Sequence, residues 1–307
     1  MKLAFIFPGQ GAQYVGMAQD LYEKSPGAKK IFEAADSVFG FSLSRLCFEG
    51  PFEELTKTEN CQPAVLTASA AALEALKEAH PGIAPSYVAG LSLGEYTALV
   101  AAGIVVFRDA VHLVRRRGEF MEAAAKKNPG KMACVLGLEK DIVAGVCRDT
   151  GCEIANLNCP GQVVISGRFD ALERASEASM EKGAKRVISL DVSGAFHCSL
   201  MDEASLRLKA EIDKVPFAKP QIPLISNVDA EEQADPLVIK NNLIRQVNTA
   251  TYWESSMRYL LSRGVDTYLE IGPGSVLKGL MKKIDPAAKV INIGKWEDLQ
   301  QLTGVLG

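Results

Sequence analysis

Histidine is scarce in this sequence, and neither sign of charge is in clear excess. The 307 residues include three histidines, and 34 Lys and Arg stand against 37 Asp and Glu, for a formal net charge of −3. A general nucleic-acid-binding protein neutralises a run of phosphates and needs a basic excess or a basic stripe. We therefore expect no nucleic-acid partner, and a histidine base has to be one of three residues.

Long hydrophobic runs are also missing. The first apolar run, Leu3 to Phe7, stops at Pro8 and is too short for a membrane span or for the core of a signal peptide. No later run reaches spanning length. We expect a cytoplasmic protein with no membrane partner.

The seven cysteines are odd in number, scattered, and never spaced as Cys-x-x-Cys. This pattern is typical neither of a disulfide framework nor of a structural zinc site. We expect buried, reduced thiols and no bound metal.

Length and composition together predict one large core with an insertion. Hydrophobic residues make up 48% of the chain and charged residues 23%, and there is no low-complexity tract. Such a chain can bury a substantial core. Its length exceeds that of an average domain but is ordinary for an α/β enzyme that carries a small inserted domain.

Strands and helices alternate near both ends of the chain, which is typical of an α/β domain with a parallel sheet. The predicted strands cover residues 3–7, 87–90, 223–226 and 267–271, and the predicted helices cover 63–79, 95–102, 108–126, 200–214, 236–246 and 253–263. We assign residues 1–127 and 193–307 to one large domain with an α/β-hydrolase-like fold.

The middle of the chain has a different order of elements. The pattern predicts strand, helix, strand, strand, helix, strand at 132–136, 140–150, 153–158, 163–166, 170–182 and 186–190. This βαββαβ order is ferredoxin-like, and the turn Cys159-Pro160-Gly161-Gln162 would join the two middle strands as a hairpin. We predict that residues 128–192 form an inserted small domain.

Ser92 lies in Gly90-Leu91-Ser92-Leu93-Gly94, between a predicted strand and a predicted helix. Small residues on both sides of the serine allow the tight turn of a nucleophile elbow, which exposes the hydroxyl at the sheet edge. A plain turn with a capping serine is the alternative. The N-terminus of the following helix would point at a developing oxyanion, with the Leu93 N–H as the first donor.

Gln10 is a candidate for the second oxyanion donor. It lies between Gly9 and Gly11 directly after the first strand, and loops at the carboxyl ends of parallel strands approach the site. A plain turn explains this sequence equally well.

A serine hydroxyl needs a base to take its proton. His80 precedes Pro81 at a helix end, where a capping role is favoured, and His112 lies in a helix, where a packed or surface position is favoured. His197 remains, in a loop between the small domain and a helix, where a base can line a site. From its position alone, a structural role for His197 is equally well supported.

Arg115, Arg116 and Arg117 are consecutive in a predicted helix. A solvated face is the usual reading of such a run. Three consecutive positions cover about 300° of a helix, however, so one guanidinium is expected on the core side. A buried guanidinium needs an anionic partner.

Several motifs together resemble one family. In chain order they are Phe7-Pro8-Gly9-Gln10-Gly11-Ala12-Gln13, Gln62-Pro63, Gly90-Leu91-Ser92-Leu93-Gly94-Glu95-Tyr96, Arg117-Gly118, Asn158-Cys159-Pro160-Gly161-Gln162-Val163-Val164-Ile165-Ser166-Gly167, Gly194-Ala195-Phe196-His197, Ser226-Asn227, Arg245-Gln246 and Glu270-Ile271-Gly272-Pro273-Gly274. With these motifs the sequence, from the first strand to about Ile284, resembles the malonyl-CoA:acyl carrier protein transacylase family.

The resemblance implies the catalytic roles. Ser92 would carry the acyl group, and His197 would be its base. Arg117 would bind the free carboxylate of the malonyl group through a bidentate contact. Gln10 and Leu93 would supply the backbone oxyanion donors.

The same resemblance implies roles for three further residues. Gln62 would form a polar wall of the site, and the main-chain carbonyl of Gln246 would orient the histidine in place of an aspartate. Phe196 would leave little room for a 2-methyl branch. The sequence departs from the family at Leu91, where most members have histidine.

The implied reaction is a ping-pong transfer of malonyl from malonyl-CoA to the phosphopantetheine thiol of acyl carrier protein, in fatty acid biosynthesis, by a monomer without a cofactor. Two alternatives stay open. One is a trans-acting acyltransferase of a polyketide synthase, and the other is a serine esterase or thioesterase.

Overall fold

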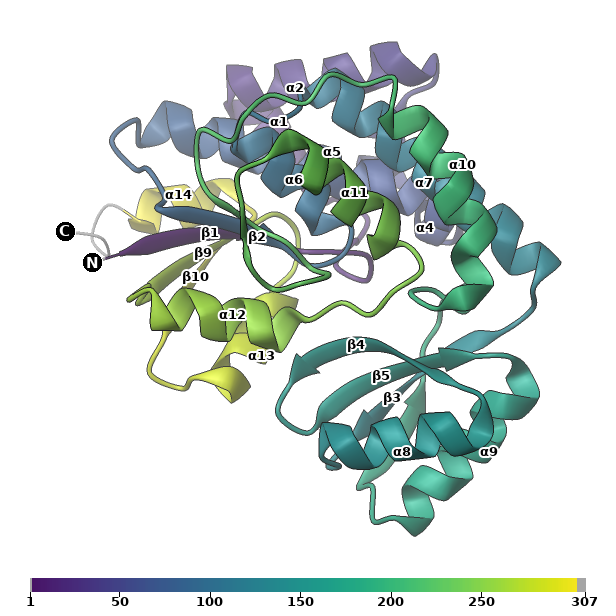
Figure 1. Cartoon of the computed structure of the whole chain (residues 1–307). Helices are drawn as coiled ribbons and strands as arrows, with labels where there is room; N and C mark the ends of the chain where they lie inside the picture. Colours follow the sequence, from purple (N-terminus) through teal and green to yellow (C-terminus); the bar gives the residue numbers. More distant parts are fainter. Residues whose placement is uncertain (1, 303–307) are drawn as a thin grey trace.

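The chain folds around two β-sheets (Figure 1). The computed structural model describes residues 2–302. Met1 and residues 303–307, which belong to the predicted large domain, lie outside the described residues. In Figure 1 the smaller sheet and its two helices form a separate lobe below the larger sheet.

The larger sheet has six strands in the order β10-β9-β1-β2-β7-β8. Strands β10, β9, β1, β2 and β7 run parallel, and β8 pairs antiparallel with β7 at the edge. The strands are β1 (Leu3–Phe7), β2 (Tyr87–Gly90), β7 (Leu224–Ile225), β8 (Glu232–Gln233), β9 (Thr267–Ile271) and β10 (Lys289–Ile293).

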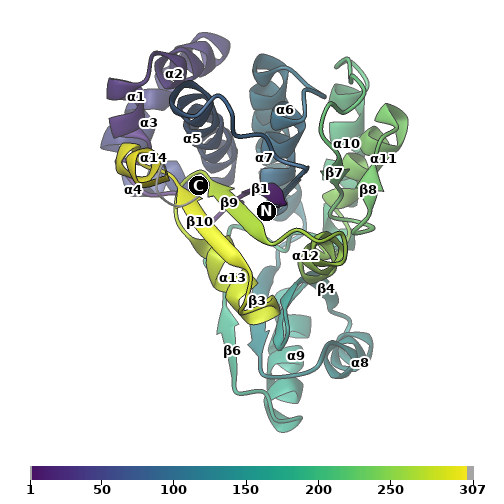
Figure 2. The same cartoon turned by 90° about the vertical axis from the view of Figure 1, so that its left-hand side faces the viewer.

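Helices cover both faces of the larger sheet (Figure 2). They are α1 (Gln19–Lys24), α2 (Pro26–Phe39), α3 (Leu43–Glu49), α4 (Phe52–Thr56), α5 (Thr58–Ala79), α6 (Gly94–Ala101), α7 (Phe107–Lys127), α10 (Asp202–Ile212) after the short 3-10 helix Ser199–Met201, α11 (Pro236–Gln246), α12 (Trp253–Ser262), α13 (Val276–Ile284) and α14 (Trp296–Leu302).

Strand β1 shows why this sheet is central. Phe5 and Phe7 pack into a core with α5 and α7 on one face. Ala4 and Ile6 pack on the other face with α12 and α13. Successive side chains of a strand point to opposite faces, so a strand covered on both sides reads as a continuous apolar run.

The smaller sheet has four strands in the order β4-β5-β3-β6, and every neighbouring pair is antiparallel. Its elements in chain order are β3 (Lys131–Leu136), α8 (Lys140–Thr150), β4 (Glu153–Cys159), β5 (Gln162–Gly167), α9 (Phe169–Glu181) and β6 (Arg186–Ser189). This is the ferredoxin-like order predicted from the sequence, so the expected α/β fold with a second, ferredoxin-like unit is confirmed.

Helix α5 begins at Thr58 rather than at the predicted Pro63, which lies inside it. Proline has no N–H, so the carbonyl four residues earlier loses its usual donor. Here that carbonyl belongs to Glu59, and it accepts a hydrogen bond from Arg115 Nη1 at 2.9 Å. A side chain from α7 thus replaces the missing donor, and the helix continues through Pro63.

Helices α1 to α4 occupy residues 19–56, where no element is predicted from the sequence. The seven cysteines all lie within the described residues and, as expected, are buried and unpaired. None of the helices within residues 2–302 combines the length and the apolar character needed to cross a membrane.

Candidate active site

Ser92 lies in a sharp turn between β2 and α6. Its backbone is left-handed, with φ 50°. A Cβ on Gly90 would lie 1.9 Å from the carbonyl carbon of Gly94, and a Cβ on Gly94 would lie 2.1 Å from the oxygen of Phe7. Only glycine fits at these two positions, and the turn brings Ser92 to the carboxyl end of the parallel strands β1 and β2.

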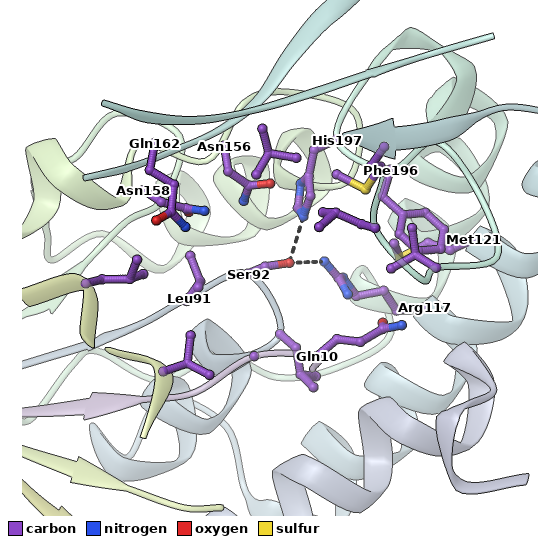
Figure 3. A pocket seen from close by; sticks show the side chains of 18 residues that line it. Gln10, Leu91, Ser92, Arg117, Met121, Asn156, Asn158, Gln162, Phe196 and His197 are labelled. Atoms are coloured by element: carbon purple, nitrogen blue, oxygen red, sulfur yellow. Dashed lines mark hydrogen bonds between the residues drawn. The ribbon is translucent and has the colours of Figure 1, made fainter. Parts of the chain in front are cut away.

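His197 faces the serine hydroxyl. Its Nε2 lies 2.8 Å from Ser92 Oγ (Figure 3), and its Nδ1 lies 2.7 Å from the main-chain oxygen of Gln246. A carbonyl oxygen only accepts, so Nδ1 carries the proton and Nε2 is left as the acceptor for the serine proton. The imidazole is therefore positioned as a general base, with a carbonyl in the place of the aspartate of a triad.

Burial keeps His197 neutral. The side chain is 5% exposed, and burial lowers its pKa from 6.5 to about 4, helped by the nearby charge of Arg117 and opposed by the Gln246 carbonyl. At neutral pH the ring is free to accept a proton.

Arg117 approaches the serine from the other side. Its Nη2 donates to Ser92 Oγ at 3.1 Å (Figure 3) and to Gln246 Oε1 at 3.0 Å, and its Nη1 donates to Gln62 Oε1 at 2.8 Å. The guanidinium is 1% exposed, so it is the one of the three consecutive arginines that points to the core. Arg115 and Arg116 pair with Glu119 instead.

The structure shows no anionic partner for Arg117 within residues 2–302, contrary to the expectation from the sequence. Among the described residues no carboxylate lies within ion-pair distance of its guanidinium, and both amide oxygens that it contacts are neutral. No carboxylate therefore compensates its positive charge beside the Ser92 hydroxyl, although the guanidinium lies over the ring of Tyr96, 5.6 Å from its centroid. The carboxylate of an acyl group such as malonyl would supply the missing negative charge.

Gln62 takes a different place from the one expected. It is fully buried, does not line the cavity, and accepts from Arg117 while its Nε2 contacts Met121 Sδ at 3.4 Å. Gln62 therefore holds the guanidinium from behind rather than forming a wall of the site.

Gln10 and Leu93 both line the cavity that contains Ser92. Within residues 2–302 their backbone N–H groups have no hydrogen-bond acceptor, while the Gln10 side chain donates to Thr58 Oγ1 at 3.4 Å. Two unused N–H groups next to a nucleophile can receive a developing oxyanion.

A cavity of about 210 Å³ lies between the two sheets above Ser92. The elbow and α7 supply one side, and β4 and β5 supply Asn156, Asn158 and Gln162, which lie across the cavity from Gln10 in Figure 3. Apolar side chains complete the lining: Leu91, Met121, Met132, Val164, Leu190, Val192, Phe196, Val276 and Leu280. The space suits a small acyl group on a slender arm.

Two buried residues near Ser92 have no predicted role, although both lie in the motifs quoted above. Asn227 Nδ2 donates to Gly90 O at 2.7 Å, and its Oδ1 accepts from Ser92 N at 2.6 Å, so it binds both sides of the turn. Glu95 Oε2 accepts from Gln246 Nε2 at 2.5 Å and from Asn227 N at 3.3 Å. No spacing rule signals these contacts, because they join distant parts of the chain.

The other two histidines lie outside the site. His80 caps α5 and contacts the carbonyl of Leu299 at 2.8 Å, and His112 is exposed. Residues 2–302 contain no group of three His, Cys, Asp or Glu side chains arranged to hold a metal ion.

Comparison with known proteins identifies the family. Residues 4–292 match the acyl transferase domain model. A malonyl CoA-acyl carrier protein transacylase of Bacillus subtilis is 47% identical over 304 residues, which cover 97% of this chain and 95% of the relative. The chain belongs to the malonyl CoA-acyl carrier protein transacylase family. The resemblance read from the motifs is thereby confirmed, and the protein is an acyltransferase by family.

Solved structures of this family have the same fold. The malonyl CoA-acyl carrier protein transacylase of Coxiella burnetii superposes with a TM-score of 0.97 at 34% identity, covering 100% of this chain and 98% of that one. A malonyl-transacylase solved in complex with a type II PKS acyl-carrier protein gives a TM-score of 0.95 at 38% identity, covering 98% of each chain.

Proposed function

We propose that this protein transfers the malonyl group of malonyl-CoA to the phosphopantetheine thiol of acyl carrier protein, through a malonyl ester of Ser92, in fatty acid biosynthesis. One observation carries the proposal: the Ser92 hydroxyl lies between the base His197 at 2.8 Å and the guanidinium of Arg117 at 3.1 Å. A nucleophile beside a fixed, uncompensated positive charge favours an acyl group that ends in a carboxylate.

In the first half-reaction, His197 Nε2 takes the proton of Ser92 as Oγ attacks the thioester carbon of malonyl-CoA. The oxyanion forms within reach of the Gln10 and Leu93 N–H groups, and Arg117 turns from the serine to the malonyl carboxylate. The C–S bond then breaks, and the imidazolium returns its proton to the coenzyme A thiolate. A malonyl-Ser92 ester remains.

The second half-reaction runs the same steps with another thiol. His197 takes the proton of the phosphopantetheine thiol, and the sulfur attacks the ester carbon. The C–O bond to Ser92 breaks, and the proton returns to the serine oxygen. The mostly apolar lining of the cavity supports transfer to a thiol over hydrolysis, because apolar side chains do not bind water.

The surface beside the cavity supports an acidic protein as the acceptor. Lys278, Lys282 and Lys283 are exposed on α13, the helix that contributes Val276 and Leu280 to the cavity lining. A basic cluster at this place would steer an acidic carrier protein toward the opening although the whole chain carries a small negative charge.

We also propose a monomeric catalytic unit in the cytoplasm that needs no cofactor. One chain supplies the serine, the base, the guanidinium and the candidate oxyanion donors, which supports a monomer. The unpaired, buried cysteines support a reducing compartment.

Mass spectrometry after incubation with malonyl-CoA tests the proposal directly. Ser92 should gain one malonyl group and lose it again when carrier protein is added. The Arg117→Ala variant should lose malonyl loading while accepting acetyl-CoA better, and Arg116→Ala, which changes a neighbour outside the cavity, should behave as the wild type. Unchanged malonyl loading in Arg117→Ala would rule out the carboxylate role.

The two alternatives give other results in the same assay. If the enzyme serves a polyketide synthase, a polyketide carrier protein should receive the malonyl group faster than a fatty acid carrier protein. The structure of a similar malonyl-transacylase with a type II PKS acyl-carrier protein supports this comparison. An esterase or thioesterase would release free malonate without any acceptor.

A further inference from the structure

Glu95 is a buried carboxyl group for which the proposed reaction has no use. It lies in the first turn of α6, one turn after Ser92, and is 1% exposed. No cation within residues 2–302 forms an ion pair with it, and burial raises its pKa to about 8. Burying a carboxyl group without a charged partner costs free energy, so hydrogen bonds have to offset this cost.

The contacts of Glu95 fix the orientation of one amide. Gln246 Nε2 donates to Glu95 Oε2 at 2.5 Å and to the main-chain oxygen of Ser92 at 3.0 Å. Both amide protons are thereby used on acceptors. The amide oxygen is left to face Arg117 Nη2, at 3.0 Å.

The opposite amide orientation would fail at every contact. The NH₂ group would face the N–H groups of Arg117, and the amide oxygen would face Glu95 Oε2 and the Ser92 carbonyl. Glu95 Oε2 accepts these hydrogen bonds when the carboxyl group is ionised and when a neutral group carries its proton on Oε1, and the Ser92 carbonyl accepts in either case. The same amide orientation is therefore selected in both of these states.

The Gln246 amide lies between Glu95 and Arg117, and this separation affects the electrostatics of the guanidinium. A carboxylate in direct contact with the guanidinium would compete with a carboxylate of the substrate. Here Glu95 is separated from Arg117 by the Gln246 side chain, so the guanidinium is held in place by neutral oxygens and keeps its charge. His197 is held by the main-chain oxygen of Gln246, which is independent of the amide orientation.

We propose that Glu95 is a positioning residue for acyl selectivity: by orienting the Gln246 amide it holds Arg117 where the guanidinium can bind the carboxylate of the acyl group. This inference rests on the proposed function. It assigns the selectivity for a diacid to a residue that does not touch the substrate.

The test compares loading of Ser92 from malonyl-CoA and from acetyl-CoA in rapid-quench experiments read by mass spectrometry. Glu95→Met keeps the length of the side chain but removes the acceptor. It should lower kcat/KM for malonyl-CoA by about tenfold or more, mostly through KM, and change acetyl loading by less than about threefold. Glu95→Gln keeps an oxygen acceptor and should restore most of the malonyl preference.

Two controls separate positioning from general damage. Glu270→Met removes another buried carboxyl group, which accepts hydrogen bonds from Leu277, Lys278 and Asn292 rather than from Gln246. It should leave the malonyl-to-acetyl ratio unchanged. In an Arg117→Ala background, Glu95→Met should have no further effect on that ratio.

Equal losses for malonyl and acetyl loading in Glu95→Met, or no loss at all, would overturn the inference. If Glu95→Met does not fold, Glu95→Gln carries the test: the small fall that it causes in the malonyl-to-acetyl ratio should be absent when Glu95→Gln is added to Arg117→Ala, whose own low ratio should stay unchanged. An equal effect of Glu95→Gln on both substrates would overturn the inference. Failure of the wild type to load malonyl at Ser92 would instead show that the proposed function is wrong.

Discussion

Ser92 and His197 face each other at 2.8 Å with both backbones in the left-handed region, at φ 50° and φ 57°. For residues other than glycine this conformation costs on the order of 1–3 kcal/mol each, so the surrounding structure has to hold it. Asn227 holds the serine turn, and the Gln246 carbonyl holds the imidazole. The pair is therefore organised before any substrate arrives.

Removal of the Asn227 side chain should weaken this organisation. Asn227→Ala leaves the half-buried Ser92 N–H and the buried Gly90 carbonyl without this partner. We expect a loss of roughly 2 kcal/mol in stability and about tenfold slower acylation, for malonyl-CoA and acetyl-CoA alike. Chemical denaturation and quenched acylation measure the two effects. Asn242→Ala, a buried asparagine bonded to Ser226 and Asp229, should cost stability without slowing acylation; if it slows acylation equally, the positional argument is wrong.

The pH dependence of acylation should report His197. As the proposed base, His197 would act in its neutral form, and burial lowers its pKa to about 4. The rate of Ser92 acylation should therefore rise as the pH increases through about 4 and stay level from pH 6 to neutrality. A single-turnover rate profile in malonyl-CoA checks this, and a midpoint near 6.5 would show that the imidazole is not desolvated in the free enzyme.

The same pKa shift predicts an effect on stability. Because the pKa of His197 falls from 6.5 to about 4 on folding, the unfolded chain binds more protons between these values, and stability is lost as the pH drops through this window. The loss should reach about 3 kcal/mol below pH 4. The difference in unfolding free energy between wild type and His197→Gln, measured at pH 7 and again near pH 4, isolates this contribution. A difference that does not change with pH would contradict it.

A methyl group at Gly90 should break the turn. The new Cβ would lie 1.9 Å from the Gly94 carbonyl carbon, and relieving that overlap requires the backbone of α6 to move. We expect Gly90→Ala to lose more than about 3 kcal/mol of stability and to lose acylation. Gly82→Ala, at a position with open space and no positive φ, should match the wild type in thermal unfolding.

The turn at Ser92, the four strands and two helices of the smaller unit, and the candidate base could be predicted from the sequence because each depends on local pattern. Glycines on both sides of a serine between a strand and a helix are enough to predict a tight turn that exposes the serine. Elimination among three histidines left His197, and the family resemblance supplied a place for Arg117. These predictions need no knowledge of which distant residues meet.

Long-range contacts explain what could not be predicted. The start of α5 depends on a donor from Arg115, which fills the gap left by Pro63. The place of Gln62 behind Arg117, and the neutral partners of that guanidinium, depend on how α5, α7 and α11 pack. Glu95 and Asn227 look like an ordinary helix residue and an ordinary loop residue until the tertiary structure joins them.

The two sheets contribute different residues to the cavity. Ser92 follows β2 of the larger sheet, whereas the amide side chains of Asn156, Asn158 and Gln162 belong to β4 and β5 of the smaller sheet. Mutations on β4 and β5 can therefore change the shape of the cavity without removing either partner of the Ser92–His197 hydrogen bond. Substitutions at these three amides are therefore expected to change which acyl group or pantetheine arm fits the cavity, while the Ser92–His197 contact stays in place.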